Sequence, residues 1–508
     1  MLSRTAVAGR LPIATYETHI SWVFVVGDRA YKLKKPVVLD FLDYGTAARR
    51  REMCAAEVAL GRRLAPRLYH GVDAIVRRGE ELALAPADDP DALDYLVEMT
   101  AFAQDATLAA AIETDSVPPW LAARLGARLA AFHAQCPGPP VARAAARAQD
   151  EIESNLQELR TVLPDTLRPR LDRLERFLTA AIAARAGELD DRGLRGRLRE
   201  GHGDLRAEHV LLAPELAVVD CLEFNRALRT VDTADELGFL VMDLLRLDAE
   251  PLARDVLAAY RAAGGDCGGD GVVWMFAVHR ALVRAKVALL RAGQLEVDRG
   301  ALQVVGRLLD VADRCAWRGR SIAVLVICGG PATGKSTLAQ ALSERFAVPC
   351  LNTDVVRKDL LGLAPHARAG PDAYTTAMDL RTYRELGARA SALLSAHPSV
   401  IVDGTFVRDD ECLAFTTALS DDPSIVAVRC CVAPDVARRR ARQRARDRSR
   451  ISDATEAIVR AHQAEALALG SAGEALGPQI LLDTDRDPAE IQIDLDAALD
   501  LRLDVLPR

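Results

Sequence analysis

An octapeptide in the second half of the chain has the residue types and spacing of a phosphate-binding loop. Residues 329–336 read Gly-Gly-Pro-Ala-Thr-Gly-Lys-Ser, directly after the apolar run 322–327. In such a loop the glycines let backbone N–H groups point at a triphosphate, at the positive end of the following helix. Lys335 would reach the β- and γ-phosphates, and Ser336 would ligate Mg²⁺. The residues expected to contact the nucleotide are Gly329, Gly330, Pro331, Ala332, Thr333, Gly334, Lys335, Ser336 and Thr337.

Two carboxylates follow strand-like segments that would end beside this loop. Asp403 closes the apolar segment 400–403, a placement used to hold Mg²⁺ through water or to orient a nucleophile. Asp354 follows a second such segment and could accept a proton from an acceptor hydroxyl, while Arg357 or Lys358 binds the acceptor. Asp354 could also start the next helix as its N-cap, and both roles can hold together.

A basic run at residues 438–450 concentrates positive charge on an expected helix. It favours a lid whose arginines, including Arg440 and Arg444, neutralise charge on the transferring phosphoryl group and exclude water. A solvated helix face and a nucleic-acid contact are the alternatives. The run contains no aromatic residue, which counts against stacking on single-stranded bases.

The first half of the chain contains a second group of residues suited to phosphoryl transfer. The sequence His202-Gly203-Asp204-Leu205 is followed, 16 residues after Asp204, by Asp220 in an apolar segment. Asp204 on a loop would orient a hydroxyl, and Asp220 would bind Mg²⁺. His202 is expected to be a structural hydrogen-bonding residue rather than an acid or a base.

Upstream, two lysines and a glutamate complete this second group. Lys32 and Lys34 fall on one face of an expected strand at residues 30–34, which pairs with a strand at 20–26 across a Gly-Asp turn. Glu57 lies in an amphipathic stretch and could pair with either lysine. A Lys–Glu pair of this kind holds the α- and β-phosphates in kinases.

The elements that position these residues divide the chain near residue 318. Residues 1 to about 100 carry strand and hairpin signals, and residues 117–317 are mostly helical by apolar period, with a strand-like interruption at 209–222. Beyond residue 318, short β-branched segments alternate with stretches long enough for crossover helices, which predicts a parallel sheet covered on both faces. Its strands are expected at residues 322–328, 400–403, 425–432 and 479–482.

Composition is that of an ordinary cytoplasmic protein. Of 508 residues 50% are hydrophobic, and the net charge of -7 comes from 65 basic and 72 acidic residues. A mildly acidic chain is not typical of a general nucleic-acid binder. The apolar runs are far shorter than the roughly 20 residues of a membrane span, and no leader segment is evident. The ten cysteines lack C-x-x-C spacing, so we expect reduced thiols, without a disulfide framework or a zinc site.

The second half resembles small P-loop kinases of the zeta-toxin, chloramphenicol phosphotransferase and gluconate-kinase type, a group that includes AAA-type ATP-binding domains annotated broadly as kinases. The resemblance covers residues 320–500 and rests on the loop at 329–336, Asp354 with Arg357 and Lys358, Asp403, and the arginine-rich run. The acceptor does not follow from these residues.

Residues 15–300 resemble the aminoglycoside phosphotransferase family, which has a protein-kinase-like fold and phosphorylates hydroxyls of small molecules. The matching segments besides the His202 motif are residues 18–24 at the nucleotide loop, 95–99 at the hinge between lobes, 130–133, 223–225 and 232–243. The resemblance implies nucleotide contacts at the hinge residues Glu98 and Met99.

One position departs from that family's H-G-D-x-x-x-x-N pattern, because the last place is taken by His209. The asparagine normally binds Mg²⁺ through oxygen, and imidazole is a poorer ligand for this cation. If His209 is not the metal ligand, then Glu208, Glu223 or water substitutes, or the site uses one metal or a softer one.

Together the chain resembles bacterial fusions of an aminoglycoside-phosphotransferase-like domain with a P-loop kinase domain, α/β overall. The expected domains are a bilobal α+β kinase-like domain at 1–318, with lobes at about 1–98 and 99–318, and a parallel-sheet P-loop domain at 319–508. The expected function is Mg²⁺-dependent transfer of phosphate from ATP or GTP to a small-molecule hydroxyl, with no membrane and no obligate protein partner. The alternatives are an N-terminal pseudokinase that regulates the P-loop half, a P-loop half that is a binding switch, and a polynucleotide kinase that uses the arginine run.

Overall fold

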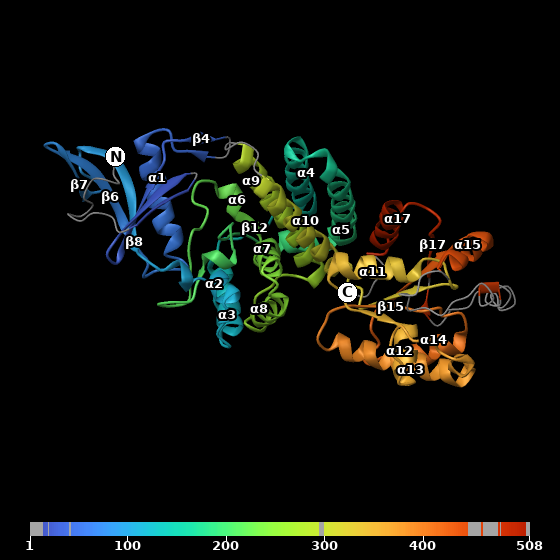
Figure 1. The fold of residues 1–508 in the computed structure, drawn as a ribbon. Helices are drawn as coiled ribbons and strands as arrows, with labels where there is room; N and C mark the ends of the chain where they lie inside the picture. Colours follow the sequence, from blue (N-terminus) through green and yellow to red (C-terminus); the bar gives the residue numbers. More distant parts are fainter. Residues whose placement is uncertain are drawn as a thin grey trace. The chain divides into compact units, whose positions relative to one another are not determined.

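The chain folds into two compact units, each composed of two segments of the sequence. In the computed structural model one unit comprises Met1–Ser154 and Arg185–Arg284, and the other comprises Asn155–Ala184 and Ala285–Arg508 (Figure 1). The structure describes residues 14–18, 20–39, 42–293, 299–444, 459–460, 476–477 and 479–503. None of the helices within these ranges is long and apolar enough to cross a membrane.

The first unit begins with an antiparallel sheet. Its 6 strands run in the order β1-β2-β3-β8-β6-β7. The expected hairpin is present: β2 (Ser21–Val26) pairs with β3 (Arg29–Lys34) across a turn in which Gly27 has a φ of 63°. A positive φ costs glycine little, which explains this residue at the turn. The remaining strands are β1 (Ala14–Glu17), β6 (Tyr69–Arg78), β7 (Glu81–Pro86) and β8 (Ala92–Thr100).

Helix α1 (Ala47–Gly61) packs on one face of this sheet. Thr46 caps its first turn by accepting a hydrogen bond from the backbone N–H of Arg49. Cys54 and Val58 of the helix share an apolar cluster with Val97 of β8. Glu57 is one turn from Cys54 along the helix and is 2% exposed. The packing of α1 therefore brings a carboxylate to the sheet beside β3.

The rest of the first unit is mostly helical, with short strands in its loops. The helices are α2 (Leu108–Glu113), α3 (Leu121–Gln135), α6 (Arg226–Arg229), α7 (Thr233–Arg246) and α8 (Glu250–Ala262), and longer α4 (Ala144–Val162), α5 (Arg168–Leu194) and α9 (Asp270–Gly293) extend past the unit's limits. Two antiparallel pairs, β9 (Leu198–Glu200) with β12 (Thr230–Asp232) and β10 (Val210–Leu211) with β11 (Ala217–Val218), frame the segment from 200 to 220. Part of the strand-like interruption expected at 209–222 is this β10–β11 hairpin.

The second unit contains a parallel sheet of 5 strands in the order β14-β15-β13-β16-β17. The strands are β13 (Val324–Cys328), β14 (Cys350–Asn352), β15 (Val400–Asp403), β16 (Ile425–Cys431) and β17 (Gln479–Asp483). The strand at 400–403 coincides with the expected one, and the other three expected strands are present with ends shifted by one or two residues.

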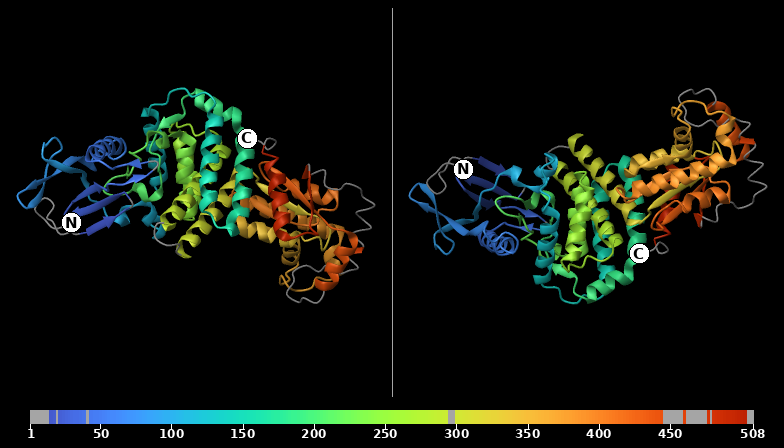
Figure 2. Two further views of the ribbon diagram at one scale, coloured as in Figure 1. Left: turned by 90° about the horizontal axis from the view of Figure 1, so that it is seen from above. Right: turned by 90° about the horizontal axis from the view of Figure 1, so that it is seen from below.

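Helices cover both faces of this parallel sheet, as Figures 1 and 2 show within this unit. On one face, α10 (Arg299–Gly319), α11 (Lys335–Phe346) and α17 (Pro488–Asp500) contribute to one apolar cluster, in which Trp317 stacks on Phe346. On the other face, α12 (Thr353–Leu360), α13 (Thr376–Leu394) and α14 (Asp409–Thr416) contribute to a second cluster. Helix α15 (Pro434–Arg444) follows β16. The sheet is buried on both sides, which explains its nearly uninterrupted apolar strands.

Candidate phosphoryl-transfer sites

The loop at 329–336 joins β13 to α11 and has backbone angles that its glycines permit. Gly329 has a φ of 129° and Gly334 a φ of 93°. A Cβ atom on Gly329 would lie 2.5 Å from the carbonyl oxygen of Cys430 on the neighbouring strand, so no side chain fits there. Because α11 begins at Lys335, the helix N-terminus faces the loop. This is the geometry that binds anions.

Side chains around the loop hold its shape. Lys335 Nζ and Thr333 Oγ1 each donate to the carbonyl oxygen of Gly330, both at 2.9 Å. Thr484, just beyond β17, donates to the carbonyl oxygen of Thr333 and lies 3.1 Å from that of Cys431. The lysine is thus folded over the loop, where a phosphate would meet it, whereas Ser336 and Thr337 are exposed at the start of α11.

Asp403 ends the strand adjacent to this loop. Strand β15 lies between β13 and β14, and Asp403 is opposite Ile327 on one side and Asn352 on the other. Its carboxylate is buried and accepts a hydrogen bond of 2.6 Å from Asn352 Nδ2. Thr353 Oγ1 donates to its backbone carbonyl at 2.7 Å. The carboxylate is therefore held in place at the end of the sheet where the loop begins.

Asp354 occupies the first turn of α12, but it is not the residue that caps the helix. Asn352 is the N-cap, and its side chain accepts from the backbone N–H groups of Asp354 and Val355 at 2.9 and 3.1 Å. The N-cap interpretation of Asp354 is wrong because α12 begins at Thr353, which places Asp354 inside the first turn of the helix.

The two basic residues expected to bind an acceptor differ in their surroundings. Arg357 Nη1 donates to Asp379 Oδ1 at 2.6 Å and to the carbonyl oxygen of Ala373 at 3.0 Å. Lys358 is 1% exposed, and its Nζ donates to the carbonyl oxygen of Pro365 at 3.0 Å. Asp379 also accepts from Arg408 at 2.8 Å, so it joins two arginines. Neither Asp379 nor Arg408 was predicted from the sequence, because neither belongs to a recognisable motif and only the structure shows that they contact each other.

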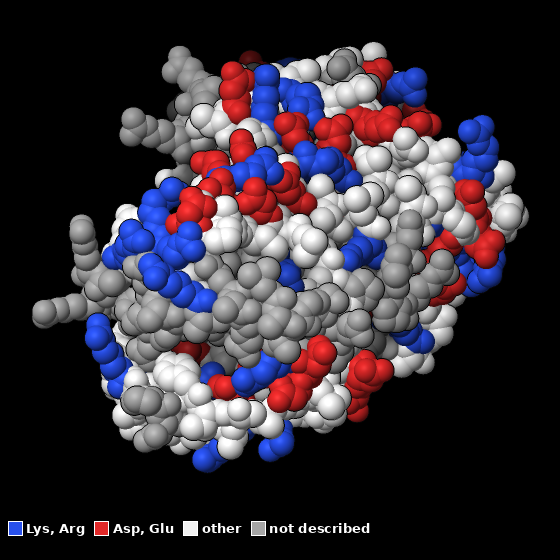
Figure 3. Space-filling model, turned by 90° about the vertical axis from the view of Figure 1, so that its right-hand side faces the viewer, with Lys and Arg blue, Asp and Glu red and all other residues white. Residues whose placement is uncertain are grey.

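The arginine-rich run contacts the loop region through Arg440 and through Ala441, which shares an apolar cluster with Ala332 of the loop. Arg440 Nη2 donates to the carbonyl oxygen of Thr484 at 2.8 Å and lies 3.3 Å from Asp485 Oδ1. Arg444 is the last residue of α15, and its side chain and residues 445–450 lie outside the described part of the chain. On the face drawn in Figure 3, Lys and Arg side chains are interspersed with Asp and Glu among the coloured residues.

In the first unit, Lys32 joins Glu57 of α1 to Asp220 of the loop after β11. Its Nζ lies 2.8 Å from Glu57 Oε1 and 2.7 Å from Asp220 Oδ1. Burial alone would lower the pKa of Lys32, but Asp220 and Glu57 outweigh it and raise that pKa well above its ordinary value. Lys32 is therefore a fixed cation between strand β3, helix α1 and the loop after β11.

Lys34 lies two residues further along β3 and is completely buried. Its Nζ lies 2.7 Å from Glu57 Oε2 and also contacts Glu223. Tyr44 OH donates to the same Glu223 oxygen and lies 3.3 Å from Lys34 Nζ. Glu57 thus binds one lysine with each oxygen, and Lys34 holds Glu57 in position from the side away from Asp220.

Asp204 lies on the loop before the 3-10 turn 207–209 and is bound by an arginine. Arg206 Nε donates to Asp204 Oδ1 and Arg206 Nη2 to Oδ2, both at 2.8 Å, and Arg206 Nη1 contacts Glu208. Burial raises the pKa of Asp204, but His209 and Arg206 lower that pKa by more, so that it lies below its ordinary value. Arg206 was not predicted as a site residue, although its position two residues after Asp204 could have indicated it.

His209 lies between the two aspartates. Its Nδ1 is 2.8 Å from the carbonyl oxygen of Asp204, and its Nε2 is 3.1 Å from Arg206 Nη2 and 3.6 Å from Asp220 Oδ2. The side chain of Asp220 is half exposed, and the residue has a φ of 66°. Lys32 above all holds the pKa of Asp220 well below its ordinary value, so that its carboxylate is ionised.

A buried network fixes the backbone of the His202 motif. Glu236 of α7 accepts from the backbone N–H of Gly203 at 2.7 Å and from that of His202. His133 Nε2 lies 2.6 Å from the other Glu236 oxygen, and Tyr260 OH is 2.9 Å from His133 Nδ1. His202 Nε2 contacts the carbonyl oxygen of Val219 at 2.8 Å. These contacts give His202 the structural role expected for it.

The hinge residues Glu98 and Met99 lie near the end of β8. Glu98 is opposite Tyr31 of β3, and its carboxylate is 3.6 Å from Arg29 Nη1. Met99 is buried in the cluster beneath α1. Both residues lie on β8, the strand that pairs with β3, and their contact with nucleotide stays a prediction.

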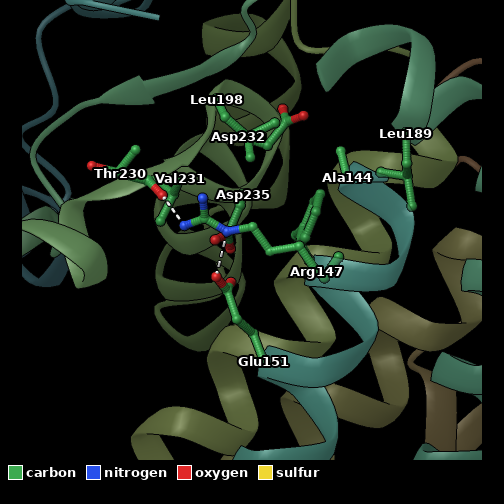
Figure 4. A pocket seen from close by; sticks show the side chains of 11 residues that line it. Ala144, Arg147, Glu151, Leu189, Leu198, Thr230, Val231, Asp232 and Asp235 are labelled. Carbon is green, nitrogen blue, oxygen red and sulfur yellow. Dashed lines mark hydrogen bonds and ion pairs between the residues drawn. The ribbon is translucent and has the colours of Figure 1, made fainter. Parts of the chain in front are cut away.

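A small pocket elsewhere in the first unit belongs to neither site (Figure 4). Its lining residues are Ala144, Arg147, Ala148, Glu151, Leu189, Leu198, Thr230, Val231, Asp232, Asp235 and Phe276. Arg147 bonds Glu151 at 2.9 Å and the carbonyl oxygen of Thr230 at 2.9 Å, as Figure 4 shows. Asp235 is paired with Arg280 at 2.6 Å, and Asp232 with Arg192. The charged side chains of this pocket are paired with one another or with the neighbouring Arg192 and Arg280.

Fold and sites define a chain that joins an α+β unit, with an antiparallel sheet and a Lys–Glu–Asp cluster, to an α/β unit with a parallel sheet and a phosphate-binding loop. A family model described as an AAA domain matches residues 324–468. Uncharacterized protein Rv2004c of Mycobacterium tuberculosis is 31% identical over 470 residues, which is 88% of this chain and 90% of that protein, and Mb2027c of Mycobacterium bovis matches equally. The chain belongs to the family of these mycobacterial proteins.

Solved structures resemble each half separately. A gluconokinase from Sinorhizobium meliloti 1021 is similar at 17% identity and a TM-score of 0.27, over 36% of this chain and 94% of that one. A choline/ethanolamine kinase family protein from Mesorhizobium loti is similar at 14% identity and a TM-score of 0.33, over 59% of this chain and 92% of that one. Similarities of this size identify neither an acceptor nor an activity.

Proposed function

We propose that this protein is a phosphotransferase with two sites, each of which uses ATP or GTP and Mg²⁺ to phosphorylate a hydroxyl of a small molecule. The observation that carries the proposal is the contact of Lys32 with both Glu57 and Asp220, because it joins a phosphate-binding lysine to a metal-binding carboxylate. A structural salt bridge alone would not require the Asp220 carboxylate to be half exposed, next to the segment whose Val219 carbonyl contacts the His202 ring.

In the P-loop site, the chain's own groups supply positioning and charge. Backbone N–H groups of the loop and Lys335 would bind the β- and γ-phosphates. Asp354 would accept the proton of the acceptor hydroxyl. The hydroxyl oxygen of the acceptor would bond to the γ-phosphorus, and the bridging oxygen would leave with the nucleoside diphosphate. Arg440, held next to the loop by the Thr484 carbonyl, is suited to stabilise negative charge there.

The acceptor of the P-loop site would lie beside Asp354 and Arg357. Arg357 is anchored by Asp379, so its guanidinium is pre-organised to orient an acceptor. Lys358 is buried and bonded to the Pro365 carbonyl, which favours a role in fixing the segment after α12. Arg357 and Lys358 are both buried, and we keep both as acceptor-contacting candidates.

In the N-terminal site, Lys32 and Glu57 would fix the α- and β-phosphates, and Asp204 would take the proton of the attacking hydroxyl. The backbone of the Asp204 loop is held by Glu236, so the carboxylate is presented from a rigid support. Glu98 and Met99 would border the nucleobase of the bound nucleotide at the hinge.

The carboxylates present fit Mg²⁺ in both sites. Asp403 with the hydroxyl of Ser336 offers the hard oxygen ligands that this ion prefers, and so does the half-exposed carboxylate of Asp220. When bound, Mg²⁺ would neutralise charge on the phosphate oxygens.

The proposal is tested by measuring phosphate transfer from ATP and GTP to sugars, aminoglycosides, nucleosides and oligonucleotides. The intact chain is compared with Lys335→Ala, Asp204→Asn and the double variant, and an untargeted screen of metabolites extends the panel. Each single variant should lose a different acceptor activity and the double variant both. If one single variant loses every activity and the other loses none, the two-site proposal is refuted.

A further inference from the structure

The charged cluster between Asp204 and Asp220 contains a cation that the proposed function leaves without a role. Arg206 is 7% exposed and is surrounded by the candidate base, by Glu208 and by His209. A guanidinium has five N–H donors and stays charged at any physiological pH. It lies in the place where a phosphoryl-transfer site needs positive charge.

The hydrogen bonds of His209 define which of its nitrogens carries the proton. Nδ1 is 2.8 Å from the carbonyl oxygen of Asp204, which can only accept, so Nδ1 is the donor. Nε2 is 3.1 Å from Arg206 Nη2, which can only donate, so Nε2 presents its lone pair to the arginine. A proton on Nε2 would place two donors against each other.

This arrangement occupies the nitrogen that would otherwise bind a metal. Among the residues that the structure describes, there is no group of three or more His, Cys, Asp and Glu side chains able to hold a metal ion. The first metal position, at Asp220, fits Mg²⁺, but a second one at His209 does not, because its lone pair and Asp204 both already bind the guanidinium.

We propose that Arg206 replaces the second metal ion of the N-terminal site and directly neutralises charge on the transferring phosphoryl group, with His209 as its positioning residue. This rests on the proposed function of that site. Nε and Nη2 are fixed by Asp204 and His209, whereas Nη1 contacts Glu208, whose side chain is 51% exposed. A phosphate oxygen can replace that exposed carboxylate without disturbing the rest.

The chemistry of this step is balanced by groups already named. The acceptor oxygen bonds to the γ-phosphorus, the bond to the bridging oxygen breaks, and the nucleoside diphosphate leaves. The hydroxyl proton passes to Asp204, and Arg206 stays charged throughout. Because Arg206 binds Asp204 through both oxygens, it also orients the base.

The number of metal ions bound tests the inference independently of activity. Mn²⁺ is counted by electron paramagnetic resonance in the full chain carrying Lys335→Ala, with a non-hydrolysable ATP analogue present. The same chain with Asp220→Asn added serves as the reference, since the ions it lacks are those of the N-terminal site. We expect a difference of one ion per chain.

A difference of two ions would overturn the inference and leave the proposed function intact, whereas no difference would overturn both. When Arg206→Ala and His209→Asn are added together, the difference in Mn²⁺ ions per chain should rise to two. The first change removes the guanidinium, and the second supplies an amide oxygen that can bind the metal. An unchanged count in that folded double variant would also contradict the inference. For transfer by the N-terminal site, Arg206→Lys should keep more of kcat than Arg206→Ala, and equal loss would argue against a role for its charge.

Discussion

Replacement of Gly329 by alanine should disable the P-loop unit, whereas the same change at Gly330 should be tolerated. At Gly329 the added Cβ would lie 2.5 Å from the Cys430 carbonyl oxygen, and the φ of 129° is one that side chains rarely adopt. Strain of this kind costs about 1–3 kcal/mol, and forced repacking costs about as much again. We therefore expect Gly329→Ala to lower local stability by about 3 kcal/mol or more.

Gly330→Ala is the matched control in the same loop. Its Cβ would meet only Thr333 Cγ2, at 3.9 Å, which is an ordinary contact. The cost should stay below about 0.5 kcal/mol. Hydrogen exchange of peptides from β13 and β16, measured by mass spectrometry, reports the local stability, and calorimetric titration with ATP reports binding. Equal exchange and equal affinity in the two variants would refute the reasoning about the loop's backbone.

Further predictions concern the charged residues of both units. Lys34→Met should lower the free energy of unfolding by about 3–5 kcal/mol because it leaves Glu223 buried without its cation. Lys32→Met should chiefly abolish nucleotide binding at the N-terminal site. Urea unfolding and nucleotide titration separate the two effects, and equal destabilisation by both variants would contradict this assignment. The pKa of Glu236 falls to about 2, since His133 and backbone N–H groups outweigh the burial that raises it, so its stabilisation is complete above the unfolded pKa of about 4.5 and is lost as the pH falls toward 2. This pKa shift corresponds to about 3 kcal/mol of unfolding free energy. The difference in urea unfolding midpoint between the unsubstituted chain and Glu236→Gln should therefore become smaller as the pH falls from about 5 to about 3, and a constant difference would argue against the role of Glu236. Asp403→Asn should raise the Mg²⁺ concentration needed for transfer at the P-loop site at least about tenfold, measured by varying Mg²⁺ at saturating nucleotide, and an unchanged requirement would remove Asp403 from the metal site.

Much of the second unit could be predicted because its signals are local. The strand at 400–403 and the loop at 329–336 depend on neighbouring residues alone, and the parallel sheet follows from strand and helix alternation. An N-cap role for Asp354 was one open interpretation, and the structure gives that role to Asn352, because asparagine also caps helices well and α12 begins at Thr353.

The N-terminal site was less predictable because its contacts join residues far apart in the chain. Lys32 and Lys34 lie on the same face of β3. Only the position of Asp220 in the structure shows that Lys32 is the lysine that contacts the candidate metal-binding carboxylate. The position of Arg206 close to Asp204 in the sequence is a weak signal, and its role depends on the orientation of the His209 ring, which the sequence does not give. The domain limits at residue 318 remain a prediction, while residues 155–184 and 285–318 belong with the P-loop unit in the structure.

Calorimetric titration with a non-hydrolysable ATP analogue, in the presence of Mg²⁺, counts the nucleotide sites on the chain. The intact chain should bind two molecules of the analogue, and Lys335→Ala and Lys32→Met should each bind one. Binding of a single molecule by the intact chain, lost in one variant and unchanged in the other, would contradict the account.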